Sequence, residues 1–109
     1  MLASILAILV IPLAAPQAGP EGSQADAPVG LTVVMVDVGQ GDGIVVRAPD
    51  GQVHAFDAGP EGQGFAAMVP MINSLQPTGY GYTVLSHFHT DHQGGLDDLL
   101  NTFAFQVAL

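Results

Sequence analysis

The sequence predicts an α/β fold in which short apolar strands and helices pack together around a mixed sheet. Runs of β-branched and apolar residues recur after residue 30, and turn residues such as Gly, Pro and Asp separate them. Two segments between these runs have the pattern of helices. Alternating strands and helices are typical of α/β domains, in which helices cover the sheet.

The composition is typical of one small folded domain, or a piece of one, rather than of a disordered chain. Of the 109 residues, 49% are hydrophobic and 10% are charged, and the formal net charge is -9. Arg47 is the single basic side chain, so this segment lacks the lysine- and arginine-rich face of strong nucleic-acid binders. The chain has no cysteine, so a metal site here would need histidine and carboxylate ligands.

Residues 1–18 are predicted to be a signal peptide or an N-terminal anchor. Leu2 to Ala15 are almost all apolar, which suits a signal-peptide core but is too short to span a bilayer comfortably. Cleavage after Ala18 would make the protein periplasmic or secreted, although the usual N-terminal basic residue is missing. An uncleaved anchor and a core helix are the alternatives. Residues 19–30, rich in Gly, Pro, Ser and Gln, are predicted to be a flexible linker.

The folded part is predicted to begin with an antiparallel meander of three strands. Leu31–Val38 is apolar on both faces, and Ile44–Ala48 returns after a glycine-rich turn at residues 39–43. A turn signal at Pro49-Asp50-Gly51 precedes the third strand, Val53–Phe56. No helix follows the glycine-rich turn and the Lys-Ser/Thr pair of a phosphate loop is missing, so a phosphate cradle is excluded.

Helices and further strands are predicted after the meander. Gly64–Leu75 is amphipathic, and Pro70 is expected either to kink this helix or to begin a second one. Tyr82–Leu85 is expected to be a buried strand. Leu96–Leu100 is expected to be a helix with acidic residues in its first turn, and Phe103–Leu109 begins another strand.

A histidine motif (residues 87–92) directly follows the last buried strand and has the sequence His-Phe-His-Thr-Asp-His. Imidazole nitrogens and carboxylate oxygens are preferred zinc ligands, and a catalytic zinc takes three protein ligands plus a water. His87 and His89 lie two residues apart in an extended segment, so they face the same way and can hold one ion. Asp91 and His92 follow where the chain bends, and could face a second ion or the bound water. The motif therefore predicts a metal site formed by these four residues.

Two motifs resemble those of a known family. The pattern His-x-His-x-Asp-His at residues 87–92 resembles the signature of the metallo-β-lactamase superfamily. The stretch Asp37-Val38-Gly39-Gln40-Gly41-Asp42 is similar to a motif of its ComEC-like branch, the hydrolase domain associated with DNA-uptake competence proteins. The resemblance covers residues 31–109 and implies a four-layer αββα sandwich assembled from two similar halves. These residues would be the first half, a truncated N-terminal part of that domain.

The resemblance also implies that the cofactor is zinc and that two zinc ions are bound. His87 and His89 would bind the first ion, and Asp91 and His92 the second. Each ion needs further ligands, which are expected downstream of residue 109 because no histidine follows His92. The 109 residues alone are therefore expected to bind zinc weakly and to turn over no substrate.

Three residues outside the histidine motif are expected to support the metal site. By resemblance, Asp57 is an outer carboxylate that orients a ligand without binding the ion. Gln40 and Asp42 are expected to hydrogen-bond across the histidine motif, while their glycine-rich turn lets the backbone pass close to it. The alternatives are an ordinary turn-forming role for Asp57 and a purely structural role for Gln40 and Asp42.

The function implied by the resemblance is that of a metal-dependent hydrolase, specifically a ComEC-like phosphodiesterase or nuclease acting on DNA. Zinc-bound hydroxide would attack the phosphorus centre, and Asp91 would be the catalytic residue that orients or deprotonates the water. A small-molecule hydrolase, such as a lactonase or β-lactamase relative, is an alternative that the acidic composition favours mildly. A second alternative is a non-catalytic DNA-handling module of the same fold, but the intact set of metal ligands argues against it.

Overall fold

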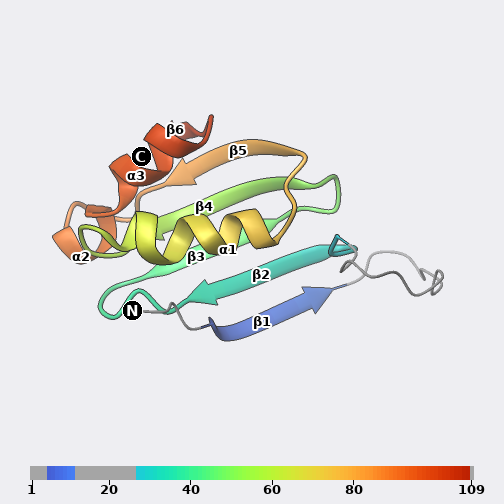
Figure 1. Ribbon diagram of the computed structural model, residues 1–109, viewed down its shortest axis with the longest axis horizontal. Coiled ribbons are helices and arrows are strands. Elements are labelled where there is room, and N and C mark those ends of the chain that lie inside the picture. The colour runs from blue at the N-terminus through green and yellow to red at the C-terminus, as the bar shows by residue number, and fades with distance from the viewer. Residues whose placement is uncertain (1–4, 12–26, 109) are drawn as a thin grey trace.

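The computed structural model describes residues 5–11 and 27–108, which form one sheet with helices packed on one face (Figure 1). Six strands follow one another across the sheet in chain order: β1 (Ile5–Ile11), β2 (Leu31–Val36), β3 (Gly43–Arg47), β4 (Gln52–Ala58), β5 (Gly79–Val84) and β6 (Gln106–Ala108). The helices are the π-helical turn η1 (Gly64–Met68), α1 (Val69–Ser74), α2 (Thr90–Gln93) and α3 (Leu96–Thr102). The prediction of an α/β fold with a mixed sheet is therefore confirmed.

The strand directions explain why two distant parts of the chain meet. The predicted antiparallel meander is confirmed as β2, β3 and β4. The next two pairings, β4 with β5 and β5 with β6, are parallel. Because parallel neighbours end at the same edge of a sheet, the chain leaving β4 and the chain leaving β5 lie close together there.

The structure adds a strand at the N-terminus that the sequence analysis did not predict. Residues 5–11, within the predicted signal or anchor, form β1 and pair antiparallel with β2 along the edge of the meander. A run of Ile, Leu and Val suits a strand as well as a signal-peptide core, so hydrophobicity alone did not separate the two. Residues 12–26, which include the predicted cleavage site and most of the predicted linker, lie outside the described residues. None of the helices in the described segments has the length and apolar character needed to cross a membrane.

The hydrophobic core lies between the sheet and η1, α1 and α3. Alternate residues of the meander point into it, and Val34, Val45 and Val53 are fully buried. Met68 and Ile72 from the helices are equally buried against them. The opposite face of the sheet is apolar but open among the described residues. There, Met35, Phe56 and Tyr82 remain 43%, 40% and 48% exposed.

Two predicted elements differ from the observed ones for identifiable reasons. The predicted helix Gly64–Leu75 is divided into η1 and α1, with Pro70 in the first turn of α1. The backbone remains helical at Met68 and Val69, so the helix changes from π- to α-type without a break, and Pro70, which lacks an N–H, is tolerated in the first α-helical turn. The last strand is shorter than the predicted Phe103–Leu109, because Phe103 and Phe105 turn into the core instead. Their rings lie 4.9 Å and 5.4 Å from the ring of Tyr80.

Candidate metal centre

The site is built at the edge of the sheet where β4 and β5 both end. Asp57 is the second-last residue of β4, and Ser86 lies two residues after the end of β5. Asp57 has a left-handed backbone conformation, with φ +57°, which Asp adopts more readily than most residues. Its side chain is buried, with the residue only 5% exposed. A buried carboxylate at this edge needs hydrogen-bond donors, and the chain that follows β5 supplies them.

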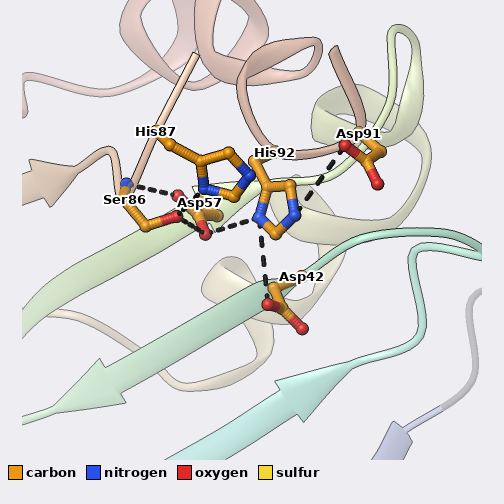
Figure 2. Close-up of polar contacts among 6 residues, drawn as sticks. All are labelled: Asp42, Asp57, Ser86, His87, Asp91 and His92. Carbon is orange, nitrogen blue, oxygen red and sulfur yellow. Dashed lines mark hydrogen bonds and ion pairs between the residues drawn. The ribbon is translucent and has the colours of Figure 1, made fainter. Parts of the chain in front are cut away.

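Asp57 accepts three hydrogen bonds from the segment that contains the histidine motif (Figure 2). Its Oδ1 accepts from the Ser86 backbone N–H at 2.8 Å. Its Oδ2 accepts from the Ser86 hydroxyl at 2.6 Å and contacts Nδ1 of His92 at 2.8 Å. Asp57 therefore ties the beginning of the segment, Ser86, to its end, His92. The expectation that this carboxylate orients a histidine agrees with this geometry.

The hydrogen bonds shift the pKa values of both partners. Burial acts to raise the pKa of Asp57, but the Ser86 donors and His92 outweigh it and hold the pKa below the ordinary value. The hydrogen bond to Asp57 raises the pKa of His92; desolvation opposes this, and the charges of Asp57, Asp91 and Asp42 add to it. Asp57 is therefore ionised and can only accept, so Nδ1 of His92 holds the hydrogen. In the neutral ring, Nε2 then has the free lone pair.

The four residues predicted as metal ligands lie close together. The ring of His87 is centred 4.6 Å from that of His89 and 4.0 Å from that of His92. Nε2 of His92 lies 3.8 Å from Oδ1 of Asp91. The short helix α2 creates this arrangement: His89 is its N-cap residue, and Asp91 and His92 lie within it. The sequence predicted only a bend here.

A second group of possible ligands shares only His92 with this set, and in the described segments it is the one group whose ligand atoms converge closely enough to hold an ion. Ligand atoms of Asp42, Asp57 and His92 all lie within 4.8 Å of one another, so these three residues could hold a metal ion. Asp42 reaches the group from the glycine-rich turn, with Oδ2 3.8 Å from Nδ1 of His92. Asp42 and Asp57 were predicted to lie around a metal and not to bind it, so this group was not predicted. The signal that could have found it is the position of the two aspartates, one directly before β3 and one near the end of β4, which antiparallel pairing of these strands brings together.

The glycine-rich turn approaches the histidine motif as expected. Gly41 has φ +76°, and a Cβ added to it would overlap the backbone carbonyl of Asp91. The close backbone contact therefore requires glycine at this position. Gln40 is exposed and makes no hydrogen bond within the described residues, and Asp42 lies 3.8 Å from His92, so the expected hydrogen bonds across the motif are absent for both side chains. The turn directs the Gln40 side chain to solvent, whereas Asp42 faces His92.

The charges of the site favour a cation. Asp42, Asp57 and Asp91 surround His92, as Figure 2 shows, and a divalent ion would offset their negative charge. Arg47, the one arginine or lysine among these 109 residues, does not take part, because it is buried in the sheet. Its guanidinium donates to the carbonyls of Pro28 at 2.8 Å and Gln76 at 3.4 Å.

The comparisons with known proteins give a relative but no family. No family model matches the chain, and no solved structure matches it. The chain is similar to the uncharacterized protein YcaI of Escherichia coli (strain K12), with 41% identity over 73 residues. The alignment covers 62% of this chain and 9% of YcaI, so the chain spans a small part of the length of that relative. Because YcaI is itself uncharacterized, the similarity assigns no activity.

Proposed function

We propose that this chain is part of a metal-dependent hydrolase with a metallo-β-lactamase-like fold. The observation that supports the proposal best is that the ring of His87 lies against the other two histidine rings of the motif, with Asp91 beside His92. Imidazole and carboxylate ligands without thiolates suit a hydrolytic zinc site. The motifs at residues 37–42 and 87–92 resemble those of the ComEC-like branch, which is why we favour that branch.

The hydrogen bonds favour His87, His89, Asp91 and His92 over the second group as the ligands. Asp57 already accepts three hydrogen bonds, which leaves about one of the four acceptor sites of its carboxylate for an ion. Nδ1 of His92 holds a hydrogen toward Asp57 and cannot bind a metal in that state. Its Nε2 atom is available and faces Asp91. Asp57 would then orient His92, as carboxylates commonly do behind metal-binding histidines.

The chemistry assigned to the site is hydrolysis. A divalent ion, when bound, supplies a Lewis acid that acidifies water and polarises a substrate oxygen. Asp91 would help to hold the second ion, and its carboxylate oxygens would orient the attacking water or accept its proton. His87 and His89 would fix the first ion, and Asp57 would keep His92 in one orientation.

The open face of the sheet supports the larger αββα architecture. Met35, Phe56 and Tyr82 expose large apolar side chains on the face opposite the helices. Contiguous exposed apolar side chains of this kind mark a surface that packs against something else. In the proposed fold, a second sheet from elsewhere in a longer polypeptide covers it. The small share of YcaI that the alignment spans agrees with a longer protein. Export of the protein is likewise a proposal, based on the apolar run at residues 2–15.

We propose a phosphodiester, such as DNA, as the substrate, because of the Asp-Val-Gly-Gln-Gly-Asp stretch at residues 37–42. A specific observation favours a second candidate, a hydrolase of small molecules. Arg47, the only lysine or arginine in the chain, is buried, so no basic side chain of these residues is exposed to a DNA backbone. A lactone or β-lactam needs no such contacts.

The test is an assay of the full-length, zinc-loaded protein against bis-p-nitrophenyl phosphate, single-stranded DNA, a lactone and nitrocefin. Asp91→Asn should lower the hydrolysis rate roughly 100-fold or more. The matched control is Asp97→Asn, because Asp97 is an exposed aspartate in the first turn of α3, and it should retain activity. Hydrolysis of the lactone or nitrocefin alone would replace the phosphodiesterase assignment with the second candidate. No Asp91-dependent hydrolysis of any of the four would contradict the hydrolase proposal.

A further inference from the structure

The hydroxyl of Ser86 links the buried carboxylate to a second histidine. Its Oγ lies 2.6 Å from Oδ2 of Asp57 and 2.8 Å from Nδ1 of His87. Both distances are short enough for strong hydrogen bonds. Figure 2 shows Ser86 beside both Asp57 and His87, with His92 on the other side of the same carboxylate.

The number of hydrogens fixes the direction of both bonds. A serine hydroxyl has one hydrogen to donate and two lone pairs to accept with. The ionised carboxylate of Asp57 can only accept, so the Ser86 hydrogen is directed to Asp57. The remaining contact requires Nδ1 of His87 to be the donor and Ser86 Oγ the acceptor. In the neutral ring of His87, the lone pair is then on Nε2.

We propose that Ser86 is a positioning residue that links the Asp57 carboxylate to His87 by hydrogen bonds. Through this link it sets the ring orientation of His87 and determines which ring nitrogen carries the hydrogen. The proposal rests on the proposed metal centre, where His87 is a ligand. One carboxylate then prepares two ligands, His92 by direct contact and His87 through Ser86. Both rings present Nε2 as the ligand atom before any ion binds. Preparing ligands in advance in this way lowers the ordering cost of metal binding.

The first test is the tautomer of His87 in the metal-free protein, measured from the imidazole ¹⁵N chemical shifts. The spectra are recorded well above the ordinary histidine pKa of about 6.5, so that the rings are neutral. The wild-type protein should have the hydrogen of His87 on Nδ1. Ser86→Ala should lose this preference, because the acceptor is gone, and Ser86→Thr should restore it with its own hydroxyl. Ser74→Ala is the matched control, because within the described part of the chain the Ser74 hydroxyl bonds only to the Met71 carbonyl and sulfur in its own helix turn.

The second test is zinc titration of the same four proteins. Ser86→Ala should bind zinc roughly 10- to 100-fold more weakly than wild type, while Ser86→Thr and Ser74→Ala should stay close to wild type. Urea unfolding identifies any variant that fails to fold. The tautomer of His87 in the wild-type protein tests the proposal even if a variant does not fold. A wild-type His87 with its hydrogen on Nε2, or an unchanged tautomer in Ser86→Ala, would overturn the proposal. If the tautomers behave as expected but the wild type binds no zinc, the positioning role stands and the metal centre is the part that fails.

Discussion

The histidine motif has an inner side and an outer side that are held in different ways. On the inner side, Asp57 is buried and accepts hydrogen bonds from Ser86 and His92 at 2.6 to 2.8 Å. On the outer side, His89 is exposed, and Asp91 lies 3.8 Å from the nearest nitrogen of His92, beyond hydrogen-bond distance. The inner side is therefore complete in the protein itself, whereas the outer side has ligand atoms available for an ion. Substitutions on the two sides should separate stability from metal binding.

The largest effect is expected on the inner side, from Asp57→Asn. The variant keeps the shape but loses the charge, and its amide, buried at position 57, cannot accept all three hydrogen bonds. We expect the free energy of unfolding, measured by urea titration, to fall by about 3 to 5 kcal/mol. Asp91→Asn on the outer side is the control and should change stability by less than about 0.5 kcal/mol. Equal losses in the two variants would show that the two sides do not differ.

The next largest effect tests the contact that holds the outer side in place. Gly41→Ala would put a Cβ into the backbone of Asp91 at a left-handed φ of +76°, and we expect a loss of about 3 kcal/mol. Gly39→Ala is the matched control, because Gly39 has a similar φ of +83° but no atom within 4 Å of the added Cβ. It should cost only about 1 kcal/mol, from backbone strain alone. If both variants lose the same amount, contact with the histidine motif is not what requires glycine at position 41.

The two sides also differ in how far the sequence could predict them. The meander was predictable because its β-branched runs are separated by clear turn signals, and the outer ligands were predictable because they lie within six consecutive residues. The inner network joins residues 29 and 35 positions apart, Asp57 with Ser86 and with His92. Such contacts depend on the parallel pairing of β4 and β5, which local patterns do not specify. The four-residue α2 is likewise too short to have a visible helical period.

A smaller effect is expected from pH on the metal-free protein. Folding lowers the pKa of Asp57 below 3.8 and raises that of His92 above 6.5. The stabilisation of the folded state by these two groups is therefore complete between pH 3.8 and pH 6.5. It is lost as the pH falls through the folded pKa of Asp57, and as the pH rises through the folded pKa of His92.

Thermal unfolding midpoints across this pH range check the expectation. His92→Gln should remove the decline that the wild type shows as the pH rises above 6.5. Zinc affinity should change in the opposite direction and rise with pH, because the metal competes with protons for the histidines. A wild type and variant with parallel stability curves above pH 6.5 would rule out His92 as the source of the decline.

The smallest effect on stability is expected from His89→Ala. His89 is exposed, and among the described residues its ring contacts only that of His87, 4.6 Å away between centroids. Its removal should change the free energy of unfolding by less than about 0.5 kcal/mol. Zinc affinity, measured by titration, should nevertheless fall, because an outer ligand is lost while the inner network is intact. His54→Ala is the control histidine, since His54 lies on β4 against Tyr82 and away from the motif, and it should leave zinc affinity unchanged. A His89→Ala protein that binds zinc as tightly as the wild type would remove His89 from the ligand set and favour Asp42, Asp57 and His92 instead.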